Sequence, residues 1–234
     1  MLEVKNLNVF YGNVQILWDV SLQIEEGEFV ALVGANGAGK TTLLNAIAGL
    51  VTPASGSVTF SGRDVTGLPP NELVEMGLAY LPEGGRLFPD MSVLENLEMG
   101  AYLKSSWKKK NERLEKVFQV FPRLKERRKQ LSKTLSGGER QMVAMGRCLM
   151  SGPVLGMFDE LSYGMAPKLV QETFQMLKRL HDDGLTVFLI EQNVKNSLEI
   201  ADRAYVLENG RIVSSGSSKE LLESDHIRKA YLGL

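Results

Sequence analysis

The fold of this chain is decided by one stretch of sequence, Gly34-Ala35-Asn36-Gly37-Ala38-Gly39-Lys40-Thr41-Thr42. This stretch matches the phosphate-binding pattern G-x-x-x-x-G-K-[ST]. An apolar run at residues 29–33 precedes it and indicates a buried strand, while residues 41–48 have the composition of a helix that ends near Gly49. On the order of 0.01 such patterns arise by chance in a chain of this length. A nucleotide site is therefore favoured over a glycine-rich turn that binds nothing.

Each residue type in the loop has a physical role. Glycines allow positive φ and let the backbone approach a ligand closely. Successive N–H groups then form an anion site at a helix N-terminus. We expect Lys40 to reach the β- and γ-phosphates and the Thr41 hydroxyl to hold Mg²⁺. The predicted nucleotide contacts of the loop are Gly34, Asn36, Gly37, Ala38, Gly39, Lys40, Thr41 and Thr42.

The composition limits the class of protein. Of the 234 residues, 44% are hydrophobic and 24% charged, and the net charge of −1 offers no field that would attract nucleic acid. No apolar run approaches the roughly 18 residues of a membrane-spanning helix. Residues 1–6 lack the layout of a signal peptide, and Cys148 is the only cysteine. We expect a cytoplasmic protein that would serve a membrane only as a peripheral subunit.

The chain around the loop predicts a mixed α/β fold. Residues 2–10 and 16–24 alternate as two antiparallel strands do, with a turn at 11–13. Strand, helix and strand at 154–158, 167–181 and 185–190 indicate a parallel βαβ unit. Tyr11 is either a surface turn residue or a platform for adenine, and its spacing leaves both readings open.

A helical insertion interrupts this pattern. The strand signal disappears between residues 91 and 131, and residues 104–129 hold 11 Lys/Arg and 3 Glu. A solvated basic helix face is the favoured interpretation, with anionic lipid headgroups as the alternative. We expect one domain over 1–234, with a core and antiparallel β part at about 1–80 and 151–234 and a helical subdomain at about 81–150.

Two acidic residues end the predicted strand at 154–158. Asp159 could hold Mg²⁺, and Glu160 could orient or deprotonate an attacking water. Two solvated acids would be the simpler interpretation, but a phosphate loop in the same sheet favours catalysis. A Ser-Gly-Gly turn at 136–138 opens a helix that runs to Met150, which provides a second anion-binding helix N-terminus. Two chains placed head to tail could each close the other's site.

Here a family resemblance becomes clear. The run Leu135-Ser136-Gly137-Gly138-Glu139-Arg140-Gln141 resembles the signature motif of ATP-binding cassette (ABC) ATPases. With the phosphate loop and Asp159-Glu160 in the same order, the resemblance covers the whole chain. It implies that Tyr11 stacks on adenine and that residues 162–165 form the D-loop. It also implies that the signature residues Ser136, Gly137 and Gly138 contact the ATP held by a partner chain.

A narrower resemblance is to the ATPase subunits of branched-chain amino acid importers. It is carried by residues 81–84, 88–89, 95–97, 121–124, 190–193 and 205–210. Glu83 replaces the family's Q-loop glutamine and Gln192 its switch histidine, and both replacements are similar to this subgroup. The resemblance implies that Glu83 contacts the nucleotide and Mg²⁺. It also implies that Gln192 contacts the γ-phosphate. Leu161, Gly156 and Gly85 depart from the family pattern, which leaves the turnover rate open.

The resemblance implies an ATPase that powers import of branched-chain or other hydrophobic amino acids. ATP and Mg²⁺ would be held with Thr41, Asp159 and Glu83 at the metal, and Glu160 and Gln192 would act in catalysis. Partners would be an identical or paralogous cassette, a transmembrane permease and, indirectly, a periplasmic or extracellular binding protein, at the cytoplasmic face of the membrane. Open alternatives are cassettes for urea or short amides, lipopolysaccharide export, a non-transport ABC protein and a regulator that does not hydrolyse ATP.

Overall fold

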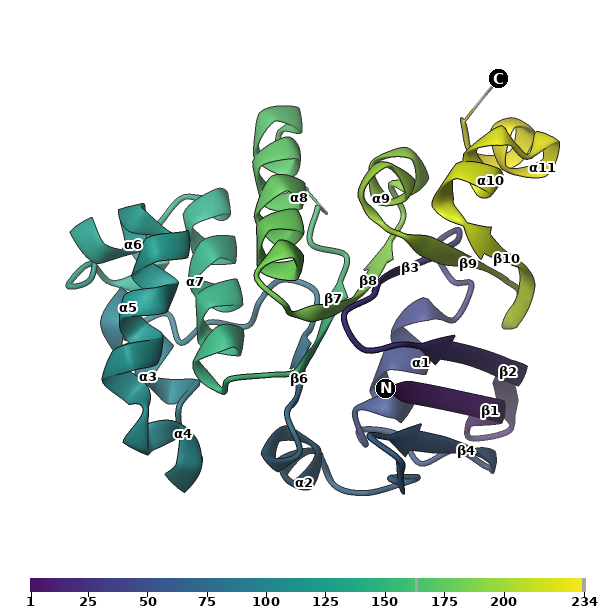
Figure 1. Ribbon diagram of the computed structural model, residues 1–234, viewed down its shortest axis with the longest axis horizontal. Helices are drawn as coiled ribbons and strands as arrows, with labels where there is room; N and C mark the ends of the chain where they lie inside the picture. The colour runs from purple at the N-terminus through teal and green to yellow at the C-terminus, as the bar shows by residue number, and fades with distance from the viewer. Residues whose placement is uncertain (163, 233–234) are drawn as a thin grey trace.

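The computed structural model describes residues 1–162 and 164–232, which form two sheets and two groups of helices (Figure 1). The larger sheet has the strand order β10-β9-β3-β8-β7-β6 and is parallel except for the edge strand β10. Its strands are β3 (Phe29–Val33), β6 (Leu78–Leu81), β7 (Leu155–Asp159), β8 (Thr186–Glu191), β9 (Arg203–Glu208) and β10 (Arg211–Ser217). This arrangement confirms the predicted mixed α/β fold.

The smaller sheet is antiparallel and has the order β2-β1-β4-β5. Its strands are β1 (Leu2–Tyr11), β2 (Val14–Ile24), β4 (Ser55–Phe60) and β5 (Arg63–Asp64). The predicted N-terminal strand pair is therefore confirmed. Tyr11, expected in the turn, is instead the last residue of β1, because the turn needs only Gly12, at φ 58°, and Asn13.

Helix α1 (Lys40–Ile47) lies between the two sheets. The central strand β3 is buried on both faces, as a strand of a parallel sheet must be. Because side chains alternate, Val30 and Leu32 share one cluster with Leu43 and Leu44 of α1, and the other strand residues face the opposite layer. The start of α1 is thus held against both sheets.

The remaining helices, except α2 (Pro70–Glu75), cover the opposite face of the large sheet or extend to one side of it, whereas Leu73 of α2 packs in the cluster that contains α1 (Figure 1). The helices other than α1 and α2 are α3 (Val93–Met99), α4 (Lys104–Lys108), α5 (Lys110–Val120), α6 (Pro122–Glu126), α7 (Gly137–Met150), α8 (Pro167–Asp182), α9 (Val194–Ile200), α10 (Ser218–Glu223) and α11 (Asp225–Ile227), with short turns η1 (Ser132–Thr134) and η2 (Arg228–Leu232). The helical character expected over residues 91–131 is confirmed. Across the described part of the chain, no helix has both the length and the apolar character needed to cross a bilayer.

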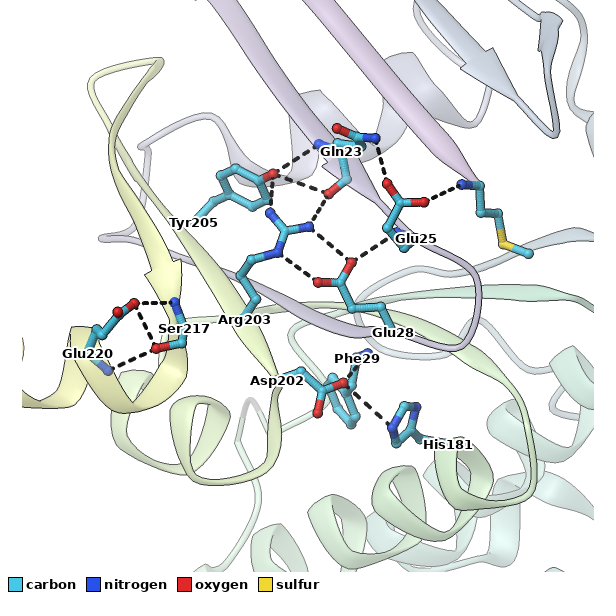
Figure 2. A network of polar contacts seen from close by, with 11 residues as sticks. Gln23, Glu25, Glu28, Phe29, His181, Asp202, Arg203, Tyr205, Ser217 and Glu220 are labelled. Carbon is cyan, nitrogen blue, oxygen red and sulfur yellow. Dashed lines mark hydrogen bonds and ion pairs between the residues drawn. The ribbon is translucent and has the colours of Figure 1, made fainter.

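A polar network joins the two sheets at the amino ends of β3 and β9 (Figure 2). The Arg203 guanidinium donates to both carboxylate oxygens of Glu28, at 2.7 and 3.0 Å, and to the Gln23 carbonyl at 2.7 Å. The Tyr205 hydroxyl accepts from the Gln23 N–H at 3.0 Å. Arg203 belongs to the large sheet and Gln23 to the small one, so these bonds fix one sheet against the other.

Candidate functional site

Three strand ends place the candidate site at one edge of the large sheet. Val33 at the end of β3 lies opposite Glu191 at the end of β8, and Ile190 lies opposite Asp159 at the end of β7. The segments that follow these strands are the phosphate loop, the acidic pair and the switch position. Ligands of parallel α/β sheets bind at such carboxyl ends.

The phosphate loop has the backbone that the sequence predicted. A Cβ at Gly34 would lie 2.2 Å from the Leu207 carbonyl oxygen, and Gly39 has a φ of 105° that side chains rarely permit. Gly39 also caps α1, and no side chain accepts a hydrogen bond from the first N–H groups of that helix. Because these N–H groups follow the glycine turns of the phosphate loop, the start of α1 is a candidate anion site.

Lys40 lies inside the loop and is 4% exposed. Its Nζ donates to the Gly34 carbonyl at 2.9 Å and to the Ala35 carbonyl at 3.1 Å. The same atom lies 3.2 Å from Oε1 of Glu160, so two predicted site residues pair directly. The cation is thus held beside the phosphate loop by two carbonyls and one carboxylate.

Asp159 is fully buried at the end of β7, and its two oxygens differ. Oδ2 accepts a hydrogen bond from the Tyr80 hydroxyl at 3.2 Å, whereas the buried Oδ1 has no hydrogen-bond partner within the described residues. Burial raises the pKa of Asp159, the Thr41 and Tyr80 hydroxyls oppose that rise, and the charges of Glu160 and Glu83 add to it. A buried charge with one free oxygen fits a cation ligand.

Thr41, Asp159 and Glu83 suit Mg²⁺ better than a metal ion whose ligands all come from protein side chains. Among residues 1–162 and 164–232 no three His, Cys, Asp or Glu side chains gather as a metal cluster. Mg²⁺ usually takes one or two protein ligands and completes its shell with phosphate oxygens and water. The Thr41 hydroxyl and the free oxygen of Asp159 could act as such a pair, and Glu83 is an exposed residue whose charge acts on Asp159.

Glu160 stands in an uncommon backbone conformation. Its φ is 45°, in the left-handed region, and its N–H donates to the Ile190 carbonyl at 2.9 Å. Gln192, two residues beyond Ile190, is exposed at the same edge of the sheet. The structure thus brings the residues of the phosphate loop, the acidic pair and the switch position together.

The Ser-Gly-Gly turn is not part of this group. The start of α7 lies in the helical layer, on the far side of α8 from α1 (Figure 1). Ser136 is the N-cap, its hydroxyl donating to Glu139 at 2.8 Å and accepting from the Glu139 N–H at 3.4 Å. Gly137 is exposed with open space around its Cα, and Gly138 packs close to Leu169. The turn is therefore preformed but lies away from the phosphate loop of its own chain (Figure 1).

Other predicted residues have mixed placements. Tyr11 is 48% exposed at the end of β1, where a platform for a flat ligand is sterically open. Of the expected D-loop, Tyr163 lies outside the described residues. Sequence reasoning missed Tyr80, 79 positions away from Asp159, whose single hydroxyl proton is shared between Asp159 Oδ2 at 3.2 Å and Asn45 Oδ1 at 3.3 Å. No local motif marks such a residue; only the strand pairing of β6 with β7 brings it there.

The three departures from the family pattern have local explanations. A Cβ at Gly156 would lie 2.7 Å from the Phe158 ring, so the glycine makes room for that side chain. Gly85 has a φ of 65°, and its carbonyl accepts from the Arg147 guanidinium at 2.6 Å. Leu161 is 2% exposed and packs in the main core.

The loop after β3 and the acids after β7 place the chain among the P-loop nucleotide hydrolases. Comparison with known proteins then specifies the group: the chain belongs to the ABC transporter family, whose model matches residues 17–162. It is 46% identical to BraG of Pseudomonas aeruginosa, a high-affinity branched-chain amino acid transport ATP-binding protein, over the full length of both chains.

Solved structures support the same assignment. The ADP conformation of MJ1267, an ATP-binding cassette of an ABC transporter, is 31% identical with a TM-score of 0.85, over 100% of this chain and 99% of that one. A dimeric post-hydrolysis state of the cassette MJ0796, bound to ADP and Pi, is 27% identical with a TM-score of 0.78, over 93% and 99%. The predicted cassette fold is confirmed.

Proposed function

We propose that this protein is the ATP-hydrolysing subunit of an ABC importer for branched-chain or other hydrophobic amino acids. The observation that carries the hydrolytic part is the meeting of Lys40, Asp159 and Glu160 at one sheet edge. The substrate class rests on the full-length similarity to BraG. The chain would work as one nucleotide-binding domain with a helical subdomain at about 81–150, at the cytoplasmic face of the membrane.

The phosphates of ATP would lie on the N–H groups of residues 34–42 and the uncapped start of α1. Lys40, already positioned by the Gly34 and Ala35 carbonyls, would add its charge at the β- and γ-phosphates. The Thr41 hydroxyl and Asp159, with Glu83 beside them, would hold Mg²⁺, which neutralises phosphate charge in reactions of this kind. Tyr11 would stack on the adenine.

Glu160 would accept the proton of the attacking water. Its carboxylate lies 3.2 Å from Lys40 Nζ, so it is held next to the group that contacts the γ-phosphate. Gln192 would add a polar contact to the γ-phosphate from the neighbouring strand end. Both residues stand at the edge where the phosphate loop begins, as in-line attack on that phosphate requires.

The site is completed by a second cassette. The start of α7 lies away from the phosphate loop of its own chain, so the Ser-Gly-Gly turn that opens this helix would serve the ATP of a partner chain (Figure 1). The partner would be an identical or a paralogous cassette. A transmembrane permease would bind this dimer, and a periplasmic or extracellular binding protein would deliver the amino acid to the permease.

The test is the variant Glu160→Gln, with Glu199→Gln on the exposed face of α9 as the matched control. Losing the general base should slow ATP hydrolysis roughly 10²–10⁴-fold while ATP stays bound. The variant should therefore scatter light as a dimer with ATP and Mg²⁺ and as a monomer with ADP. Adding Ser136→Arg should abolish the dimer, because bulk and charge then fill the seat of the partner's γ-phosphate.

A Glu160→Gln protein that hydrolyses ATP at the wild-type rate would remove Glu160 from the reaction and contradict the proposal. One that stays monomeric at saturating ATP would exclude the homodimer and leave a paralogous cassette as the partner. Calorimetry with leucine, isoleucine and valine should give no heat of binding to the purified subunit. Tight binding of any of them would indicate a regulator that senses amino acids directly.

A further inference from the structure

One buried carboxylate at the sheet edge has no role in the proposed hydrolysis. Glu191 is the last residue of β8 and is only 1% exposed. It lies opposite Val33, the residue before the phosphate loop, and directly precedes the switch residue Gln192. A buried carboxylate is costly unless its oxygens are hydrogen-bonded, so its partners are informative.

Both oxygens of Glu191 are used by a single residue. The Ser162 N–H donates to Oε1 at 2.9 Å, and the Ser162 hydroxyl donates to Oε2 at 2.7 Å. Burial raises the pKa of Glu191, hydrogen bonds from Ser162 and Asn193 oppose that rise, and the nearby charge of Glu160 adds to it. The carboxylate thus forms a two-point clamp on the segment that follows Glu160.

A second bond ties the same two segments together. The Glu160 N–H donates to the Ile190 carbonyl at 2.9 Å, so bonds from positions 160 and 162 reach positions 190 and 191. Leu161, between them, is buried in the core. A non-glycine residue at a φ of 45°, such as Glu160, keeps that conformation only where its surroundings enforce it.

We propose that Glu191 is a positioning residue that locks the turn carrying Glu160 to the strand end carrying Gln192. Glu160 and Gln192, which would face the γ-phosphate, would then move as one unit with Ser162, which lies in the segment between β7 and α8. This inference rests on the proposed ATP hydrolysis, and Glu191 itself touches no reacting atom. The clamp depends on hydrogen-bond geometry and requires no proton transfer by Glu191.

The chemistry of the clamp allows position and charge to be separated. In Glu191→Gln the amide oxygen can accept from the Ser162 N–H, and the amide N–H can donate to the Ser162 hydroxyl, because a hydroxyl both donates and accepts. Glutamine therefore keeps both contacts without the charge. Glu191→Ala removes both, and Ser162→Ala removes only the hydroxyl contact.

The experiment compares the ATPase kinetics of these three variants with wild type, using Glu199→Ala as the control. We expect kcat to fall at least about tenfold in Glu191→Ala and to stay within about threefold of wild type in Glu191→Gln, with KM for ATP changed less than about twofold in both. Ser162→Ala should lower kcat less than Glu191→Ala does. In the double variant it should add nothing to the loss caused by Glu191→Ala, because the contact is already gone.

A second measurement does not depend on hydrolysis. Hydrogen exchange of the Ser162 amide should quicken at least about tenfold in Glu191→Ala and stay near wild type in Glu191→Gln. If wild type hydrolyses no ATP, the proposed function fails, while the exchange result still tests the clamp. If Glu191→Ala does not fold, Ser162→Ala and Glu191→Gln still decide whether Glu191 acts by positioning the turn or by its charge.

Three results would overturn the inference. A Glu191→Gln variant as slow as Glu191→Ala would make Glu191 a charged participant in the reaction. Full activity in Glu191→Ala would leave the clamp without function. Unchanged Ser162 exchange in Glu191→Ala would show that other contacts hold the turn.

Discussion

The two ends of the parallel sheet use the same kinds of residues in opposite ways. At the amino ends, Arg203 and Glu28 satisfy each other, and the pKa of Glu28 is lowered: burial alone would raise it, but the bonds and charge of Arg203 prevail (Figure 2). At the carboxyl ends, Asp159 keeps an oxygen without a partner among the described residues, and its pKa is raised by burial. One end is built for stability, and the other holds charge in readiness for a ligand.

The largest expected effect comes from removing the cation at the carboxyl end. Lys40→Ala should reduce ATP hydrolysis to background, a loss of about 10³-fold or more, because the charge at the β- and γ-phosphates disappears. The melting temperature should change by only a few degrees, since water that enters the space of the lost side chain can hydrate the Gly34 and Ala35 carbonyls and the Glu160 carboxylate. The exposed pair Lys5 and Glu3 provides the control Lys5→Ala. Wild-type hydrolysis by Lys40→Ala would place the phosphates elsewhere.

The next effect concerns the amino end and should have the opposite character. Arg203→Leu leaves the Glu28 carboxylate without its main partner, which should cost about 2 kcal/mol of stability in urea unfolding. At temperatures well below melting, kcat should equal that of wild type. A large loss of kcat in the folded variant would mean that the two ends of the sheet are coupled. The amino ends would then not serve stability alone.

The same pair carries a pH dependence with a definite sign. Because the folded pKa of Glu28 is lower than its ordinary 4.5, its stabilisation is fully present above pH 4.5 and is lost as the pH falls through the folded value. In Arg203→Leu the acid-induced loss of unfolding free energy that comes from protonation of Glu28 should disappear. The difference in unfolding free energy between the two proteins should therefore narrow as the pH falls below 4.5.

A smaller effect on stability is expected from Asp159→Asn, which should stabilise the protein. Asp159→Asn replaces a buried charge by a neutral amide that can still accept from Tyr80, so the melting temperature at pH 7 should rise by a few degrees. Hydrolysis should be lost, and Mg²⁺ should no longer strengthen ATP binding. A melting temperature below that of wild type would show that the buried carboxylate is satisfied by contacts other than those described.

The smallest expected effect is a change in the pH dependence of ATP hydrolysis. Gln192 cannot gain a proton, so wild-type activity should lack an acid limb set by this residue, whereas Gln192→His should introduce one between about pH 6 and 7. The rate of ATP hydrolysis across pH 5.5–8.5, with roughly half-unit steps, measures it. An unaltered profile would remove Gln192 from the active edge and leave Glu160 as the only residue of that pair there.

The sequence predicts the parts of the candidate site that are local and misses contacts between distant strands. The phosphate loop and the Asp159-Glu160 pair are short motifs beside strand signals, so their sequence context was enough to predict them. The partners of Tyr80 and Glu191 lie 79 and 29 positions away, and only strand order brings them into contact. The pairing of Arg203 with Glu28 spans 175 positions and carries no motif. Polar contacts between distant strands therefore follow from the three-dimensional structure and could not be predicted from local sequence.

The bare N-terminus of α1 has a consequence for the life of the protein in a cell. A helix start without a side-chain cap gives up stabilisation that a bound phosphate can supply, so the folded state gains from nucleotide by mass action. At 100 times the dissociation constant this gain would be about 2.7 kcal/mol. Newly made or nucleotide-depleted copies would be the ones that unfold and meet proteases first. Nucleotide binding would thus contribute to the stability of this subunit before any transport takes place.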